Sequence, residues 1–448
     1  MQRADIDKIR DLLGEDTERN KLRKHISKYD IPMLAIIIDQ LDEAQKLKFY
    51  LLLPTKISSD VLLEVSQHSR KYILKSLKDK YIVSLIEKAE SDDSADILGE
   101  VPEQKAKRIM EHLPRKKKDA LEPLIRYGED TAGGLMQSEL IALKSGITVK
   151  EALDTAKKKV KYIEAANYIY VVDSQDRLKG VVTIRDLISF NQRKKLSQIM
   201  NRDLVKLRPQ MDKEKVAEIF KNEDILALPV VDSRNKLLGR VTIDDVLDVM
   251  EEEATEDMYK IAGVHPDENI FDPFTKSVKR RLPWLMLNLG TAFLAALVVS
   301  SFTDTLQAVV ILAAFMPIIA GLGGNSGTQT LTLIVRGFAL NQLSTDNYRK
   351  ILFKEISIGI VNGMILGAIM GIVAYLWQGN AVLGFVIFTA MTISLTLAGF
   401  IATSVPVLLK VLKIDPAVAS SVFITASIDI VGFFSFLGIA SLLISWLV

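Results

Sequence analysis

The sequence predicts a multidomain protein in which an α-helical superhelical domain, an α/β repeat and a connecting helix precede an all-α transmembrane domain. The chain has 448 residues and a positive mean hydropathy of +0.20, although 25% of its residues are charged. Only 11 of the 112 Asp, Glu, Lys and Arg residues lie in 282–448, so polar and apolar residues are segregated along the chain. A repeat with an offset of 59 residues within 140–255 supports several domains, and roughly 150 residues per domain gives about three.

Residues 1–130 are predicted to form a small solenoid of amphipathic helices. The helical patterns end at Leu53-Pro54, Val101-Pro102 and Leu113-Pro114, because a proline cannot continue the preceding helix. Within this region the segment SDDSAD, residues 91–96, places three aspartates close together.

Residues 136–195 and 196–254 are predicted to be the two halves of the repeat. The segment YVVDS at 170–174 aligns with PVVDS at 229–233, and GVVTIRD at 180–186 aligns with GRVTIDD at 239–245. Each half is expected to contain short β-branched strands around a turn, followed by a helix. These helices begin near Thr183 and Thr242, and Thr242 is a candidate N-cap.

An acidic run closes the repeat, and a helix over 255–280 is expected to lead from it to the membrane. The run has eight acids in fourteen residues: Asp244, Asp245, Asp248, Glu251, Glu252, Glu253, Glu256 and Asp257. A solvated helix face would explain it, but so dense a set of like charges also repels unless cations neutralise it. Divalent cations would draw cytosolic domains together there, and their loss would let repulsion separate them, which is an electrostatic gate.

Residues 281–448 are predicted to cross the membrane five times. The uncharged runs cover 282–303, 305–335, 356–409 and, with one exception, 416–448, and about 20 apolar residues suffice for one helical span. The run 356–409 is too long for one span and is expected to break at 377–380. Lys and Arg flank the spans only on the side that faces the N-terminal region, so we expect the N-terminus inside and the C-terminus outside.

The exception in the last run is Asp429. A carboxylate at this depth costs several kcal/mol unless it faces a polar cavity or a cation, so it is a functional candidate. Thr425, Asp429 and Gly432 share one helix face. In the second span, Gly321, Asn325, Thr328 and Thr332 form a stripe at helical spacing. Close helix packing explains the glycines of this span, whereas a pore wall explains Asn325 and Gln329 as well.

Oxygen ligands without any His or Cys in 282–448 favour hard cations such as magnesium or calcium. One carboxylate per chain cannot balance a divalent ion, so we predict a homodimer in which two Asp429 side chains face a shared pore. The absence of Cys excludes a disulfide scaffold and thiolate metal sites. The charged first sixteen residues do not resemble a secretory signal, and a net charge of +2 gives no support for nucleic-acid binding.

Four segments together are similar to the MgtE family of magnesium channels across essentially the whole chain. They are GEDTAGGLM at 128–136, TIDDVLDVMEEEATEDMYKIAGV at 242–264, MPIIAGLGGNSGTQT at 316–330, and the repeated G-x-x-T-x-x-D signature of a tandem CBS pair. The resemblance implies a homodimer with a helical N domain, the CBS pair, a connecting plug helix and five membrane helices. It also implies passive magnesium entry that stops when intracellular magnesium occupies acidic sites.

The resemblance assigns roles residue by residue. The pore positions are Asp429, Gly324, Asn325, Thr328 and Thr332. The helix face shared with Asp429 adds Thr425 as a further candidate oxygen ligand. The cytosolic magnesium-sensor positions are Asp92, Asp96, Asp245, Asp248, Glu253, Glu256 and Asp257. The positions for ATP or another adenine nucleotide are Thr183, Arg185, Asp186, Thr242 and Asp245.

We therefore expect a multi-pass protein of the cell (inner) membrane with a large cytoplasmic N-terminal region, whose partners are itself, the lipid bilayer and magnesium ions. One alternative is a channel for cobalt or manganese, or one whose gate does not respond to magnesium. A second alternative is a membrane-anchored nucleotide sensor that conducts nothing. No phosphate-cradling loop, nucleophile elbow or metal-binding His pair occurs in the sequence, so we do not expect an enzyme.

Overall fold

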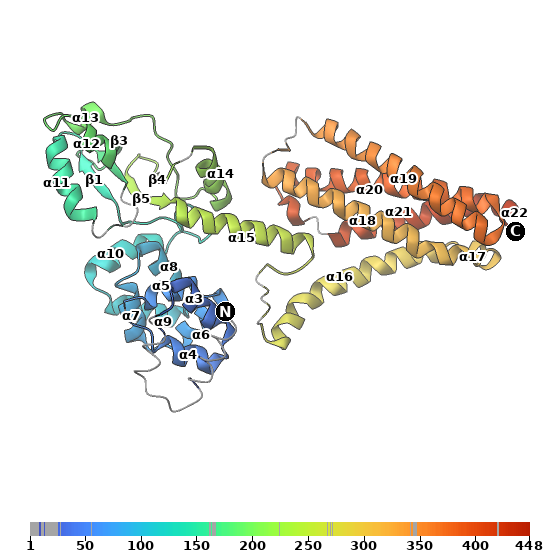
Figure 1. Cartoon of the computed structure of the whole chain (residues 1–448), viewed down its shortest axis with the longest axis horizontal. Coiled ribbons are helices and arrows are strands. Elements are labelled where there is room, and N and C mark those ends of the chain that lie inside the picture. Colours follow the sequence, from blue (N-terminus) through green and yellow to red (C-terminus); the bar gives the residue numbers. More distant parts are fainter. Residues whose placement is uncertain are drawn as a thin grey trace. The chain divides into compact units, whose positions relative to one another are not determined.

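The computed structural model describes residues 28–448, apart from 55, 161, 162, 164–166, 224, 267, 269, 271, 341, 344–346, 419 and 420, together with Ile9, Leu13 and Ile26. The chain divides into two compact units, Met1–Glu252 and Glu253–Val448, each with its own core. Elements carry the labels of Figure 1.

The first unit begins with short helices that stack on their next-but-one neighbours. α3 packs on α5, α5 on α7 and α7 on α9, while α4 packs on α6 and α8 on α10. Pro102 and Pro114 occupy the N-cap positions of α9 and α10, as the sequence predicts. The helices are α3 (Ile31–Gln40), α4 (Glu43–Tyr50), α5 (Ser58–Glu64), α6 (Gln67–Ser76), α7 (Asp79–Ile86), α8 (Ser91–Gly99), α9 (Glu103–His112) and α10 (Arg115–Leu124).

The α/β part of this unit has two small sheets that repeat one another. In the first, β1 pairs parallel with β2, and β2 pairs antiparallel with β3; in the second, β4 pairs antiparallel with β5. The elements are β1 (Ile141–Lys144), α11 (Val149–Lys159), β2 (Tyr168–Val172), β3 (Leu178–Thr183), α12 (Ile184–Ser189), α13 (Leu196–Ile199), α14 (Lys213–Glu223), β4 (Ala227–Val231), β5 (Leu237–Thr242) and α15 (Ile243–Ile261).

The 59-residue offset also holds in the backbone of the two sheets. The strand register shifts between Val171 and Val172 in one sheet and between Val230 and Val231 in the other. The tight turns place Asp176 and Asn235 at positive φ, 61° and 62°. Both turns thus connect their strands in the same way, so the repeated sequence produces a repeated fold.

The connecting helix differs from the prediction. A single helix over 255–280 does not form, because α15 begins at Ile243 and ends at Ile261, and the next helix begins only at Phe274. Gly263 takes a left-handed φ of 67°, and the Val264 amide donates to the Tyr259 carbonyl at 2.8 Å, which closes the C-terminus of α15. Pro273 then sits at the N-cap of α16. The glycine and the proline therefore separate α15 from α16, where the helical periodicity of the sequence predicted one continuous helix.

The second unit consists mainly of five long helices (Figure 1). Its elements are α16 (Phe274–Ser300), α17 (Thr303–Ala308), α18 (Leu312–Ala339), α19 (Tyr348–Gln378), α20 (Ala381–Val411), the 3₁₀ turn η2 (Pro416–Val418), α21 (Ser421–Leu442) and α22 (Ile444–Leu447). Within the described residues, α16, α19, α20 and α21 are long and apolar enough to cross a membrane by length and composition. α18, with 28 residues, has similar length but carries the polar segment.

The helix boundaries follow the predicted runs with two differences. The run 305–335 is not one helix, since the short α17 precedes α18. The last run is likewise interrupted, with α22 following α21 at Leu443. The break expected at 377–380 is confirmed: α19 ends at Gln378, Gly379 has a φ of 69°, and the Asn380 side chain caps α20 by accepting from the Val382 and Leu383 amides.

α19 and α20 are in close backbone contact along most of their length. Glycines four residues apart on α19 face the α20 backbone, namely Gly359, Gly363, Gly367 and Gly371. A Cβ atom added to Gly363 would lie 2.6 Å from the Thr392 Cα. Because the obstacle is backbone rather than a mobile side chain, only glycine fits there. This pair shows the small-residue packing that membrane helices use.

We expect Gly363→Ala to destabilise the second unit by about 1–3 kcal/mol, the usual cost of overpacking a core. Thermal unfolding of the purified protein in detergent should show a lower Tm. Gly290→Ala on α16 is the matched control, since a Cβ there meets nothing within 4 Å. Equal Tm values for the two variants would contradict this account of the α19–α20 contact.

Candidate functional site

The predicted pore residues lie on α18 and α21, which pack against each other. Asp429 is half-buried near the middle of α21, and its Oδ1 atom is buried without a hydrogen-bond partner among the described residues. Thr425 lies one helical turn earlier and is also half-buried. A Cβ added to Gly324 of α18 would lie 3.0 Å from the Thr425 Cγ2, so Gly324 and Thr425 are in direct contact.

The glycines of α18 serve mainly to bring α21 close. Gly323 and Gly327 are buried against Ile428, the residue directly before Asp429. A Cβ on Gly323 would be 2.8 Å from the Ile428 Cγ2, and one on Gly327 would overlap the Ile428 Cδ1. Of the two explanations left open for these glycines, the structure supports helix packing. Their packing in turn fixes the position of the turn that carries Asp429.

The polar residues of the predicted stripe face away from the core of this unit. Asn325 and Thr332 are exposed and Thr328 is half-buried, while a Cβ on Gly321 would meet nothing within 4 Å. The Thr332 hydroxyl donates to the Thr328 carbonyl at 2.9 Å. α18 thus presents an open face of neutral oxygen atoms beside the helix that carries the carboxylate.

A second acid within the long helices of this unit, Glu355 of α19, was not predicted from the sequence. It lies in the second turn of α19 and is 5% exposed. Its Oε2 accepts from the Thr330 hydroxyl at 3.1 Å, and the Lys354 ammonium lies 3.5 Å from its Oε1. The sequence hints at the ion pair with Lys354 only because the two residues are adjacent. The hydrogen bond to Thr330 of α18 could be found only from the structure.

In the first unit, two acids from different elements bond to one glutamine, and a third acid lies near them. Asp92 and Asp93 lie in the first turn of α8, and Asp245 lies in the first turn of α15. The buried Gln137 amide donates to Asp245 Oδ2 at 3.3 Å and also bonds to Asp92. Among the described residues, the Oδ1 atom of Asp92 is buried without a hydrogen-bond partner. Asp92, Asp93, Asp245 and Gln137 are called the Gln137 cluster below.

The cluster is fixed by bonds on either side. The buried Arg240 guanidinium donates to the Gln137 Oε1 at 3.2 Å, and the Ser91 hydroxyl donates to the Glu139 carboxylate at 2.6 Å. Burial raises the pKa of Asp92, Asp93 and Asp245, and the negative charge of Asp92 raises the pKa of Asp93 and Asp245 further. The folded chain therefore holds carboxylates close together, which favours a proton or a metal cation at this point.

The remaining predicted sensor acids are spread along two elements. Asp96 lies one turn beyond Asp92 on α8 and is exposed. Asp248 is exposed on α15, and partial loss of solvent around its carboxylate, together with the negative charges of Glu251 and Asp244, raises its pKa. Glu253, Glu256 and Asp257 belong to the second unit.

In the second unit, the end of α15 is tied to the loop after α20 by an ion pair that sequence reasoning missed. The Lys260 ammonium lies 2.5 Å from the Glu256 Oε1 and 2.7 Å from the Asp415 Oδ2. Burial, together with the negative charge of Asp415, raises the pKa of Asp257 to about 6. Asp415 directly precedes Pro416 and the turn into α21. Its position at the end of a span was the one sequence feature that could have suggested a charged partner.

The candidate nucleotide residues cap helices. The Thr183 hydroxyl donates to Asp186 Oδ2 at 2.7 Å and accepts from the Asp186 amide, which forms a capping box. The Thr242 hydroxyl, which is buried, donates to Asp245 Oδ2 at 2.5 Å. Arg185 is exposed. The two Thr-Asp pairs occupy corresponding places in the repeat, whereas Asp245 is shared with the Gln137 cluster.

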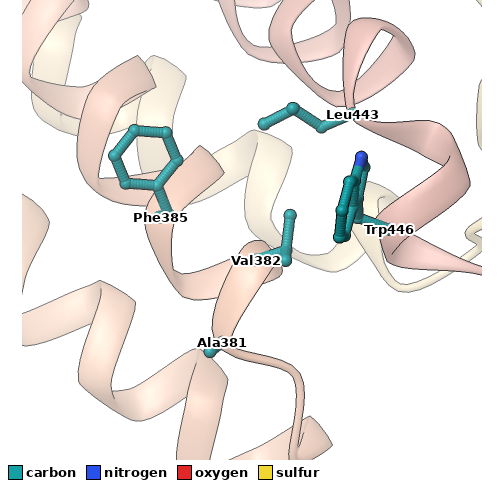
Figure 2. A pocket seen from close by; sticks show the side chains of 5 residues that line it. All are labelled: Ala381, Val382, Phe385, Leu443 and Trp446. Carbon is teal, nitrogen blue, oxygen red and sulfur yellow. The ribbon is translucent and has the colours of Figure 1, made fainter.

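Within the part of the chain that the structure describes, no three His, Asp or Glu side chains form a closed metal-binding group. A cavity of about 310 Å³ lies between the start of α20 and the C-terminal α22 (Figure 2). Its lining is Ala381, Val382, Phe385, Leu443 and Trp446. With no oxygen-bearing side chain in this lining, the cavity is unsuited to an ion.

Comparisons with known proteins agree on every region. A family model for divalent cation transporters matches residues 316–439, one for the MgtE intracellular N domain matches 29–130, and the CBS domain model matches 132–192 and 196–252. The magnesium transporter MgtE of Bacillus subtilis (strain 168) is 31% identical over 408 residues, covering 91% of this chain and 90% of the relative. The magnesium transporter MgtE of Thermus thermophilus is 35% identical over 358 residues, covering 79% of each chain.

Among solved structures, the cytosolic domain of the Mg²⁺ channel MgtE in complex with ATP is 35% identical, covering 52% of this chain and 95% of that chain with a TM-score of 0.49. The family models confirm the helical N domain and the tandem CBS pair that the sequence predicts. They also confirm that the helical unit after them belongs to a transporter rather than an enzyme.

We expect the Gln137 cluster to lose stability as the pH rises in metal-free buffer. Carboxyl groups whose pKa is raised hold protons more tightly in the folded chain, so their contribution is present below about pH 4 and is lost toward about pH 8. Hydrogen exchange of the α8 amides, corrected for the intrinsic rate, should be faster at the higher pH. Asp93→Asn should reduce this change and Asp154→Asn, on the exposed face of α11, should not. If the exchange protection of the α8 amides did not depend on pH, the Gln137 cluster would not have the predicted pH-dependent stability.

Proposed function

Because the chain belongs to the MgtE family of magnesium transporters, we propose that it is a homodimeric, magnesium-selective channel that admits magnesium to the cell and closes when intracellular magnesium is high. It is a membrane protein with a large N-terminal cytosolic region and a C-terminal region of apolar helices. The homodimer, the direction of transport, the fifth span and the feedback are the proposed parts.

Asp429 carries the proposal for conduction. Among the described residues, its side chain has a buried oxygen without a partner, and it lies in a helix without any Lys or Arg. An uncompensated carboxylate within an apolar span is costly, so a passing cation is its natural partner. Two copies related by a two-fold axis would supply two negative charges, which balance one divalent ion. Magnesium loses its waters reluctantly and suits a site with few carboxylates and neutral oxygens around it.

The Gln137 cluster supports the proposal for feedback. Asp92 and Asp93 come from the helical N domain, and Asp245 comes from the second CBS domain. Their carboxylates repel one another when ionised, which favours separation of the two domains. Magnesium bound there would remove the repulsion and hold the domains together. We propose that this state closes the pore.

We also propose that the tandem CBS pair takes an adenine nucleotide such as ATP. The repeated Thr-Asp pairs at 183/186 and 242/245 support this, since hydroxyl and carboxylate groups are the side chains that bind a ribose. Binding would have to share or displace the caps that these pairs form. Because Asp245 also belongs to the Gln137 cluster, nucleotide and magnesium would influence each other.

Asp429→Asn should lower magnesium uptake at least about 100-fold, because the amide removes the charge that balances the ion. Uptake is measured in proteoliposomes loaded with a magnesium-sensitive dye. Asp304→Asn, which removes an acid from the first predicted outer loop, is the matched control and should keep wild-type flux. Flux no greater than that of protein-free liposomes in both proteins would favour a nucleotide sensor without conduction, whereas equal measurable fluxes would remove Asp429 from the conduction path. Calcium, cobalt and manganese tested in parallel would reveal a different cargo.

Asp92→Asn combined with Asp245→Asn should weaken feedback. The two amides remove the repulsion that favours the open state and also remove magnesium ligands. The open probability without magnesium should therefore fall, and its further decrease on adding cytosolic magnesium should shrink at least about twofold. Inside-out patch recordings during magnesium titration measure both quantities. Asp119→Asn in α10 serves as the control. A magnesium response equal to that of wild type would remove the Gln137 cluster from the gate while leaving conduction untouched.

A further inference from the structure

Three helices of the second unit meet at Ser394. This residue lies on α20, whose neighbours include both α18 and α21 (Figure 1). Ser394 is 1% exposed, and its hydroxyl oxygen has no hydrogen-bond partner among the described residues. An unpaired hydroxyl in an apolar interior is costly, so this orientation needs an explanation.

Other hydroxyls on the same helix behave differently. The Thr389, Thr392, Thr396 and Thr403 hydroxyls each donate to the carbonyl four residues earlier, at 2.6–2.8 Å. That bond is the usual way to satisfy a hydroxyl on a membrane helix. Ser394 does not make it. Its oxygen instead points to two glycines on neighbouring helices.

Those glycines flank the predicted permeation path. A Cβ added to Gly323 of α18 would lie 2.7 Å from the Ser394 Oγ, and one added to Gly432 of α21 would lie 3.2 Å from it. Gly323 precedes Asn325 by two residues, and Gly432 follows Asp429 by three. Glycine Cα–H groups are weak donors to oxygen at helix contacts. One oxygen atom therefore occupies the space beside a glycine of each helix, close to their pore residues.

We propose that Ser394 is a positioning residue of the permeation path, whose hydroxyl oxygen sets the separation of α18 and α21 and thereby the place of Asp429. The inference rests on the proposed function, since it takes these two helices to line the pore. A smaller side chain would let them approach each other, and a larger one would push them apart. Ser394 thus acts on ion selectivity without touching the ion.

A rescue experiment tests the contact. For a Cβ on Gly432, the Ser394 Oγ at 3.2 Å is the nearest obstacle, since the next atoms are the Ile319 Cγ2 at 3.8 Å and the Ser394 Cβ at 3.9 Å. Gly432→Ala should therefore lower magnesium flux about fivefold in wild type. The same substitution should cost less than about twofold in the Ser394→Ala background, because the obstructing oxygen is gone.

Gly323→Ala is the matched control for the rescue. Its Cβ would lie 2.7 Å from the Ser394 Oγ but also 2.8 Å from the Ile428 Cγ2. Ser394→Ala removes only the first of these obstacles, so Gly323→Ala should remain impaired in both backgrounds. Thr389→Ala, which removes a hydroxyl that bonds only within the same helix turn, should leave flux unchanged.

Selectivity separates positioning from a merely structural role. Ser394→Thr adds one methyl group between the helices, so the ratio of magnesium flux to calcium flux should fall about threefold or more, whereas general misfolding would lower both fluxes alike. An unchanged ratio, or a Gly432→Ala defect that Ser394→Ala does not relieve, would overturn the inference while wild type still conducts. Absence of magnesium flux through wild type would instead overturn the proposed function and this inference with it.

Discussion

The charge of one carboxylate within an apolar helix is the constraint on which the second unit depends. Among the residues described, Asp429 has a buried oxygen without a partner, so its charge requires a polar partner within the membrane. The helices around it pack tightly. Ile428 lies against Gly323 and Gly327, Thr425 lies against Gly324, and Ser394 lies between Gly323 and Gly432. These small residues fix the turn that carries Asp429, while Asn325 and Thr332 of α18 remain exposed.

The two acidic regions solve the problem of like charge in different ways. Around Gln137, acids from two domains share a neutral amide, and the nearby Lys117 and Arg70 offset only part of their charge, since the pKa of all three acids stays raised. Near Asp415 the chain supplies its own cation, since Lys260 pairs with Glu256 and Asp415. The first region can therefore respond to magnesium concentration, whereas the second has a built-in counter-ion that any metal would have to displace. α15 contains residues of both.

Local patterns predicted much of this fold, and contacts between distant residues account for what they did not predict. The 59-residue offset predicts paired sheets with matching turns, and the break at Gly379 follows from one residue with a positive φ. Asp429 stands out in the sequence because charge is rare in such a run. By contrast, three contacts join residues that are far apart in the sequence and could not be predicted from it. Gly323 packs against Ile428, Gln137 bonds to Asp245, and Asp415 pairs with Lys260. The prediction of one connecting helix was wrong, because it followed the helical periodicity and gave too little weight to Gly263 and Pro273, which end one helix and begin the next.

The interlocked backbones of α19 and α20 have a consequence for biogenesis. Only Gly379 and Asn380 separate the two helices, and each helix presents glycines to the backbone of the other, as Gly371 and Gly384 do. Either helix alone would expose this groove of bare backbone to lipid. We therefore expect α19 and α20 to leave the translocon together during synthesis and to enter the bilayer as one helical hairpin that is already packed.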